Sequence, residues 1–173
     1  VSSSSHLSSY LNLPNKQIIL RANKGKNLRT KYTLYAVKYR NTYILLDLND
    51  LNNIFFQFLN MHFENYIKIK KEYNICNYKT DFFITNLNQI VEIKSVISNN
   101  EKAYYDFQSH KRAYMQLQKI KELLILGYSV NYIFVMLNPY IKIFRLKDKR
   151  KKENMLFLEC IKLGMNVKFY KTK

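Results

Sequence analysis

The chain is poor in the residues on which small secreted proteins and structural zinc sites depend. Its 173 residues include only two cysteines, Cys76 and Cys160, which lie far apart and form no CxxC pair. A chain of this length can bury a hydrophobic core without disulfides. Isolated cysteines predict neither a disulfide framework nor a zinc site. Reduced thiols and a cytoplasmic location are therefore expected.

Histidine, glycine and long apolar runs are also scarce. The three histidines, His6, His62 and His110, form no HxH or HExxH pair, and the three glycines form no GxxxxGK loop. These absences argue against a zinc hydrolase and against an NTPase. The longest apolar runs, such as Tyr132–Leu137, are far shorter than the roughly 20 residues of a membrane-spanning helix. No membrane segment is expected.

Acidic residues are few, and the resulting charge is the strongest signal in the composition. Lysine and arginine total 29 against 12 aspartate and glutamate, which gives a formal net charge of +17. Such a charge generates a strongly positive potential over much of the surface. The charge predicts a polyanionic partner, and DNA or RNA is the leading candidate. An acidic membrane surface and ribosomal RNA are the alternatives.

Hydrophobic patterning predicts an α/β fold behind a disordered leader at residues 1–15. From about residue 50 the expected order is α-β-β-β-α-β-α-β, which implies a mixed central sheet flanked by helices. Strands are expected at 16–23, 31–39, 42–48, 66–73, 81–85, 89–96, 130–137 and 166–170, and helices from about 50, over 107–126 and over 152–163.

Three charged residues of one predicted hairpin point to chemistry. Glu92 and Lys94 are two residues apart on a strand and therefore share a face. If the chain turns between Asn86 and Leu87, Asp81 lies directly opposite Glu92, with Cβ atoms about 4.5–5.5 Å apart. Two carboxylates and one ammonium group are thus expected to converge.

Two carboxylates this close favour a divalent cation, because like charges at short range destabilise each other. Asp81, Glu92 and the backbone carbonyl of Ile93 are candidate ligands for Mg²⁺ or Mn²⁺. Lys94 would orient a bound water or stabilise charge on a phosphate. The alternative is a solvated edge hairpin whose charges only pair. Apolar neighbours such as Phe82 and Val91 favour an interior hairpin.

The two strands of this hairpin resemble a known family. Lys79–Ile84 (KTDFFI) followed by Ile90–Val96 (IVEIKSV) is similar to the signature of the sugar fermentation stimulation protein (SfsA) family. The resemblance implies a PD-(D/E)XK nuclease-like domain at 49–173, with a restriction-endonuclease-like αβββαβ core. It also implies a remnant of an N-terminal OB-fold at 16–48. The implied activity is Mg²⁺-dependent DNA cleavage by Asp81, Glu92 and Lys94.

The resemblance adds two further candidate catalytic residues, and the sequence departs from the family pattern at two places. Glu72 lies where the family carries a supplementary acid, although it could instead pair with Lys70 or Lys71. Gln116 could contact the attacking water or phosphate, or lie on a helix surface. The chain has Tyr78 and Lys79 where the family usually has Ser-Arg. Of the family's helix motif it keeps Arg112 but not the glycine, lysine and histidine.

Basic residues near the turns and near the predicted site are the candidate contacts to the nucleic-acid backbone. Tyrosines interleaved with them would suit single-stranded or structured DNA. A non-catalytic DNA- or RNA-binding regulator on the same scaffold is the alternative to a nuclease. The oligomeric state is left open. The candidate contacts are Lys24, Lys26, Arg29, Lys31, Lys79, Lys111 and Arg112, with the run 147–152 as a further basic stretch.

Overall fold

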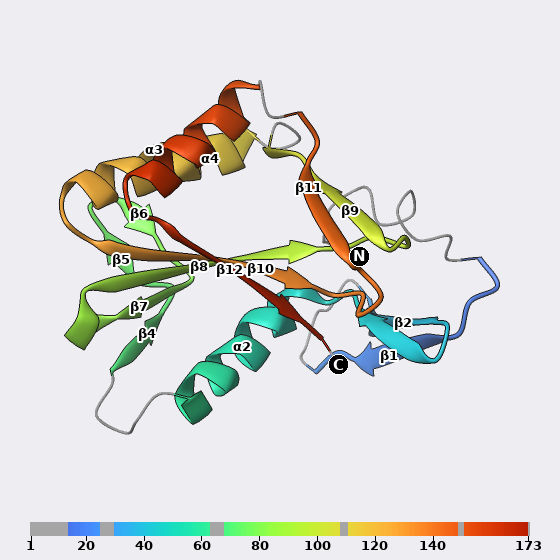
Figure 1. Cartoon of the computed structure of the whole chain (residues 1–173). Coiled ribbons are helices and arrows are strands. Elements are labelled where there is room, and N and C mark those ends of the chain that lie inside the picture. Colours follow the sequence, from blue (N-terminus) through green and yellow to red (C-terminus); the bar gives the residue numbers. More distant parts are fainter. Residues whose placement is uncertain (1–13, 25–29, 63–67, 108–110, 149–150, 173) are drawn as a thin grey trace.

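The computed structural model describes residues 14–24, 30–62, 68–107, 111–148 and 151–172, and these form an α/β fold (Figure 1). Most of the expected leader, residues 1–13, lies outside the described residues. The described part contains three α-helices, a five-stranded mixed sheet and three smaller sheets. The expected α/β class, with a mixed central sheet flanked by helices, is confirmed.

The central sheet has the order β12-β10-β8-β7-β4. β10 pairs in parallel with both β8 and β12, whereas β7 pairs antiparallel with both β4 and β8. The sheet is therefore parallel on one side of β8 and antiparallel on the other. Its strands are β4 (Ile69–Lys71), β7 (Phe82–Ile84), β8 (Gln89–Val96), β10 (Ser129–Met136) and β12 (Asn166–Lys171).

β10 lies in the middle of the sheet because its sequence is apolar on both faces. Seven of its eight residues are buried, as a strand covered on both sides requires. Tyr132 and Phe134 point into one core, and Ile133 and Val135 point into the other. The prediction of a doubly buried strand over 130–137 is confirmed to within one residue at each end.

The helices cover the two faces of this sheet. α3 (Lys111–Ile125) and α4 (Lys152–Lys162) lie side by side on one face, and α2 (Leu48–His62) lies on the other (Figure 1). α3 and α4 each end at a glycine with positive φ, Gly127 and Gly164. In each case two backbone bonds close the last turn in the Schellman pattern.

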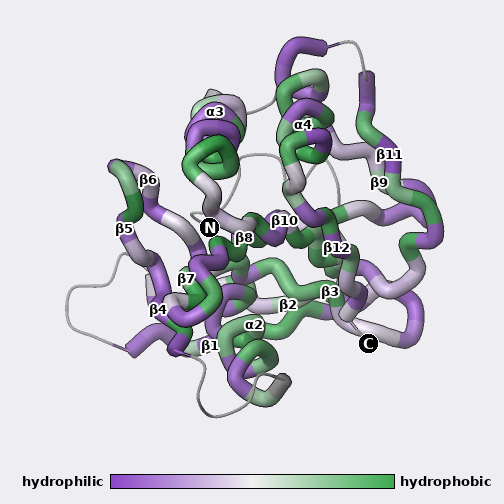
Figure 2. Tube along the Cα trace, turned by 60° about the vertical axis from the view of Figure 1, so that its left-hand side comes forward, coloured by the Kyte–Doolittle hydropathy of each residue, from purple (hydrophilic) through white to green (hydrophobic). Residues whose placement is uncertain are grey.

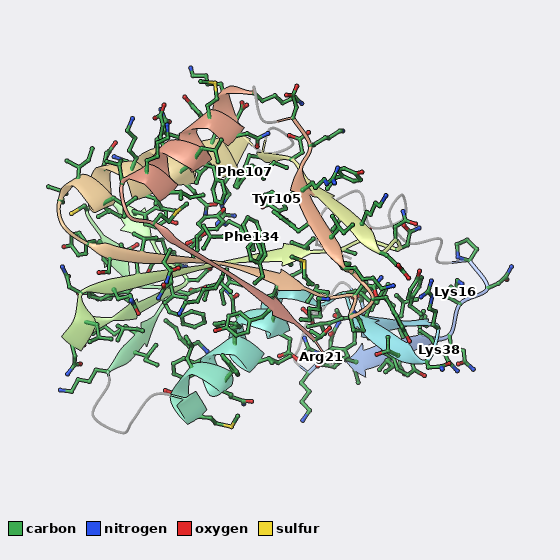
Figure 3. The ribbon with its side chains drawn as sticks, viewed as in Figure 1. Lys16, Arg21, Lys38, Tyr105, Phe107 and Phe134 are labelled. Carbon is green, nitrogen blue, oxygen red and sulfur yellow. The ribbon has the colours of Figure 1, made fainter. Side chains whose placement is uncertain are left out.

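Two hydrophobic cores result, one on each face of the sheet, and the hydrophobic stretches in Figure 2 gather in the strands between the helices. The upper core contains Leu117, Ile120, Phe107 and Phe157 with the β10 aromatics. The lower core contains Leu51, Phe55 and Leu59 of α2 with Phe82 and Ile93. Figure 3 labels Tyr105, Phe107 and Phe134 between the sheet and the α3–α4 layer.

A three-stranded antiparallel sheet packs against the lower core. It contains β1 (Ile18–Ala22), β2 (Tyr32–Tyr39) and β3 (Thr42–Leu45) in that order. Val37 and Ile44 are fully buried there. The prediction that the third strand continues to residue 48 is wrong, because the chain enters α2 at Leu48.

Four short strands were not predicted. β5 (Asn74–Ile75) and β6 (Tyr78–Lys79) form an antiparallel pair, and β9 (Lys102–Tyr105) and β11 (Ile143–Leu146) form a parallel pair. The strand predicted over 66–73 is shorter than expected at its C-terminal end: β4 ends at Lys71, and Glu72 has a positive φ of 49° that breaks the strand.

None of the described helices combines the length and the apolar character that crossing a bilayer requires.

Candidate active site

The hairpin of β7 and β8 has the predicted register. Phe82 pairs with Val91, Phe83 with Ile90 and Ile84 with Gln89. One further step of the same register sets Asp81 opposite Glu92. The connecting turn is a short 3₁₀ helix, Thr85–Leu87, followed by Asn88 with a positive φ of 48°, a conformation that asparagine tolerates better than most residues.

Asp81 lies directly before β7 and is held by two elements. Its Oδ2 accepts a hydrogen bond from the backbone N–H of Ile93 at 2.7 Å. Its Oδ1 accepts one from Nδ2 of Asn52 at 3.3 Å, and Asn52 belongs to the first turns of α2. The Asp81 carboxylate therefore joins the start of α2 to the middle of β8.

Glu92 is almost completely buried, at 1% exposure, and both of its oxygens accept hydrogen bonds. Lys94 Nζ donates to Oε1 at 2.6 Å, and the Tyr78 hydroxyl donates to Oε2 at 2.6 Å. Distances this short are typical of bonds to an ionised carboxylate. A buried carboxylate needs such partners to remain charged.

Lys94 connects the acids to α3. Its Nζ also donates to Oε1 of Gln116 at 2.9 Å and lies 5.9 Å from the centroid of the Tyr132 ring. Its side chain is 16% exposed. The structure thus brings together Asp81, Glu92, Lys94 and Gln116, four of the five predicted catalytic residues.

The electrostatics of the site reflect two acids in a small space. Burial, followed by the charge of Glu92, raises the pKa of Asp81 to about 6, while the Ile93 N–H and Lys94 oppose that shift. Burial and then Glu92 also raise the pKa of Tyr78 far above that of a free tyrosine. Tyr78 therefore remains a neutral hydrogen-bond donor. Ionisation of Asp81 costs free energy in this environment, and a bound cation would offset that cost.

Glu72, the fifth predicted catalytic residue, points away from this cluster. Its side chain is 66% exposed and forms an ion pair with Lys79 at 2.7 Å, a contact that lowers the pKa of Glu72. Lys71, one of the two surface partners that the sequence suggests, lowers this pKa further. Only the backbone of Glu72 reaches the site, through its N–H donated to the carbonyl of Asp81 at 2.9 Å.

The predicted nucleic-acid contacts fall into two groups. Lys24 and Lys31 are exposed at the connection between β1 and β2. Arg112 is exposed at the start of α3 and lies near enough to Tyr78 to affect the pKa of Tyr78. Lys79 follows Tyr78 directly in β6. Lys26, Arg29 and the side chain of Lys111 lie outside the described residues.

Asn52 and Tyr78 contact the acids but were not among the predicted site residues. Asn52 precedes Asp81 by 29 residues, so no spacing rule connects the two. In the sequence, Tyr78 stands out only as a departure from the family signature. Its position three residues before Asp81 is a weak signal, because the two-residue strand that presents it was not predicted.

The ligands available for a metal ion are two carboxylates. The part of the chain that the structure describes contains no group of three or more His, Cys, Asp or Glu side chains able to hold a metal. Mg²⁺ is commonly bound by one or two carboxylates, with waters and substrate phosphates completing its shell. Asp81 and Glu92 therefore suit Mg²⁺ or Mn²⁺ better than an ion that needs a full protein cage.

The family model described as the sugar fermentation stimulation protein RE domain matches residues 50–173, which is most of the chain. The chain belongs to the sugar fermentation stimulation protein family. The match begins within α2 and includes every residue of the site just described.

Curated relatives in this SfsA family come from bacteria and archaea. A sugar fermentation stimulation protein homolog of Clostridium kluyveri is 29% identical over 149 residues, which cover 82% of this chain and 65% of the relative. A homolog of Saccharolobus solfataricus is 26% identical over 156 residues, covering 89% of this chain and 61% of the relative. The chain thus spans a little under two thirds of the length of these relatives.

A solved structure has the same fold as this SfsA-family chain. The structure of Pyrococcus furiosus SfsA in complex with Ca²⁺ superimposes with a TM-score of 0.76 and covers 95% of this chain and 74% of the other. The sequence identity is 18%, so the match establishes the fold and extends over the β1–β3 sheet as well as the central sheet.

Proposed function

We propose that the chain is an Mg²⁺- or Mn²⁺-dependent nuclease that hydrolyses phosphodiester bonds in DNA. One observation carries the proposal: the carboxylates of Asp81, directly before β7, and Glu92, in β8, lie beside a half-buried lysine, Lys94, that is bonded to Glu92. The alternative of a solvated edge hairpin is disfavoured, because Glu92 is only 1% exposed.

Asp81 and Glu92 would hold the cation, with the carbonyl of Ile93 as a third oxygen. Each carboxylate oxygen accepts one hydrogen bond in the structure and keeps a second lone-pair site for a ligand. When bound, the cation would polarise a phosphate oxygen and lower the pKa of a water. The raised pKa of Asp81 supports a role for positive charge at this position.

Lys94 would serve the attacking water and the phosphate. Its position between Glu92 and Gln116 keeps its ammonium group at the site with little exposure to solvent. An ammonium group held in place stabilises negative charge that develops on the phosphate without first having to reorganise. Gln116 would orient Lys94 through the bond at 2.9 Å.

The charge of the whole chain supports DNA as the substrate. A net charge of +17 favours a polyanion. The exposed Lys79 follows Tyr78 in β6, and the exposed Arg112 lies near enough to act on the Tyr78 hydroxyl, so both could contact a nucleic-acid backbone beside the site. A relative with the same fold has been solved in complex with Ca²⁺, which supports a divalent cation here.

The order of elements supports a PD-(D/E)XK nuclease-like domain over 49–173. Without the short strands β5, β6, β9 and β11, the order from α2 is α-β-β-β-α-β-α-β, which contains the αβββαβ core of restriction endonucleases. We also propose that β1–β3, within 16–48, are strands of an OB-fold. The antiparallel pairing of the three strands is compatible with that assignment.

Cleavage of plasmid and single-stranded circular DNA tests the proposal. Wild-type protein with Mg²⁺ or Mn²⁺ is expected to cut, and Asp81→Ala to lose at least about 10³-fold in rate, because a bound cation contributes several kcal/mol. DNA binding by Asp81→Ala is expected to persist. Glu159→Ala is the matched control, because Glu159 is an exposed acid of α4 that pairs with Lys121 of α3. Metal-dependent cutting that survives in Asp81→Ala would refute the proposal.

A non-catalytic DNA- or RNA-binding regulator is the second candidate. It is favoured by the limited ligand set, since the described residues offer two carboxylates and no larger metal-binding group. A gel-shift assay separates the two functions: DNA that is shifted but uncut at millimolar Mg²⁺ and Mn²⁺ would favour the regulator.

A further inference from the structure

Tyr78 is the residue of the site whose role is least explained by packing. Its ring is part of the upper core, and the residue is 5% exposed. Its hydroxyl, however, leaves the apolar surroundings and donates to Oε2 of Glu92 at 2.6 Å. Phenylalanine would fill the same space, so the hydroxyl is the part that requires an explanation.

The hydroxyl completes the set of donors around Glu92. Oε1 is bonded to Lys94 on the same strand, and Oε2 is bonded to Tyr78 of β6. With one donor on each oxygen, the carboxylate plane is fixed from two directions. The remaining lone pairs are then fixed as well, and Asp81 lies on the neighbouring strand, one register step before Phe82.

We propose that Tyr78 is a positioning residue that orients the Glu92 carboxylate for a divalent cation. The inference rests on the proposed function of the site. Hydrogen-bond partners of a metal-binding carboxylate fix the orientation of the ligand before the ion arrives, and removal of such a partner typically weakens metal binding or activity by about 10–100-fold. Tyr78 is suited to this task because a neutral donor adds no positive charge that would repel the cation.

The position of β6 explains how a tyrosine can reach a residue in the middle of the sheet. β5 and β6 form a two-residue pair, Asn74 with Lys79 and Ile75 with Tyr78, outside the central sheet. Ile75 and Tyr78 are both buried in the upper core. The small hairpin is thereby anchored, and the Tyr78 hydroxyl is held on the side of β8 that carries Glu92 and Lys94.

Metal binding by Tyr78→Phe tests the proposal with MnCl₂ alone as the probe. Isothermal titration of the full chain is expected to give a Kd for Mn²⁺ about 10–100-fold higher in Tyr78→Phe than in wild type. Tyr73→Phe is the matched control, because its ring also packs in this region, stacked on Phe83 at 5.3 Å, and the described residues provide no hydrogen bond to its hydroxyl. Its Kd should equal that of wild type.

The outcomes separate this inference from the proposed function. If wild type and Tyr78→Phe bind Mn²⁺ equally, the positioning role is refuted and the proposed nuclease stands. If wild type itself binds no Mn²⁺, both are refuted. If Tyr73→Phe weakens binding as much as Tyr78→Phe, the effect is one of packing, and the positioning role is again refuted.

A second measurement uses only the wild-type protein and therefore does not depend on the folding of a variant. In metal-free wild-type protein labelled with ¹³C at tyrosine Cζ, a hydroxyl proton held by Glu92 should exchange slowly in mixed H₂O and D₂O. Tyr78 is then expected to give two resolved Cζ signals. A single averaged signal would mean that the hydroxyl exchanges freely, which would refute the positioning role.

Discussion

At the scale of single residues, the candidate site places two acids together at a cost in stability. Asp81 and Glu92 face each other with one half-buried ammonium group, that of Lys94, to offset two carboxylates. The raised pKa of Asp81 records the cost of that arrangement. A protein that places two acids together in this way is expected to be more stable when the charge is relieved.

Asp81→Asn is expected to stabilise the metal-free protein at neutral pH. Because the pKa of Asp81 is about 6 in the folded state and near 4 when unfolded, its stabilising contribution is complete below about pH 4 and is lost as pH rises through 6. Asparagine removes that loss. The gain in the free energy of unfolding should grow from near zero at pH 4 to about 2–3 kcal/mol at pH 7.5.

Urea unfolding of both proteins across this pH range measures the effect. Addition of Mg²⁺ should then stabilise wild type and leave Asp81→Asn unchanged, because ligand binding to the folded state adds to stability. A variant that is less stable than wild type at pH 7.5 without metal would contradict the prediction.

Tyr132 offers a second prediction at this scale. Its hydroxyl is buried and has no hydrogen-bond partner among the residues that the structure describes, and such an unpaired group costs about 1–3 kcal/mol. Tyr132→Phe keeps the ring and is expected to raise the free energy of unfolding by about 1 kcal/mol, measured in urea. A loss of stability would indicate that the hydroxyl is bonded in solution.

The sequence was sufficient to predict which acids meet but not what holds them. Strand alternation and the turn at 86–88 fix the register, and the register alone sets Asp81 opposite Glu92. The bonds from Asn52 and Tyr78 depend on how α2 and β6 pack against the hairpin. That packing is a tertiary contact, and no local pattern encodes it.

At the scale of elements, β10 is the strand on which the fold depends. Phe134 is completely buried, and its ring contacts aromatic rings from β9, β11, β12 and α4 as well as Phe107. It therefore joins the central sheet to the β9–β11 pair and to the helical layer (Figure 3).

Phe134→Ala is expected to lower the free energy of unfolding by about 3–5 kcal/mol, the usual cost of removing a buried phenylalanine. Phe169→Ala is the control, because Phe169 stacks on Phe134 but is 53% exposed. Its loss should cost about 1 kcal/mol, since half of its surface is already in water. Equal losses in the free energy of unfolding, measured by heat or urea, would show that Phe134 of β10 contributes no more to stability than the exposed Phe169.

The elements that the sequence predicted well are the long ones. The strands β8 and β10 have eight residues each and the three helices have 11 to 15, so each carries a long apolar pattern. The strands β5, β6, β9 and β11 have two to four residues each. β9 and β11 also pair across about 40 residues of sequence. Strands this short leave no hydrophobic pattern long enough to predict them, and their distant pairing leaves no local signal.

At the scale of the whole molecule, the charge of +17 should control how the protein meets nucleic acid. A protein that neutralises about 6–10 phosphates loses roughly 10³–10⁵ in affinity between 50 and 200 mM salt. We expect a loss in this range for a fluorescent DNA oligonucleotide followed by anisotropy. An affinity independent of salt would exclude the basic surface as the binding site.

The turn at Thr85–Leu87 makes the candidate site sensitive to the length of one loop. One additional residue there would shift the pairing of β8 against β7 by one position and exchange the two faces of β8. Val91 and Ile93 would then occupy the face of β8 that lies toward Gln116 of α3, and Glu92 and Lys94 would point into the hydrophobic core between the sheet and α2. A single inserted residue in this loop would therefore disperse the cluster of Asp81, Glu92 and Lys94, although the sequence would still contain all three.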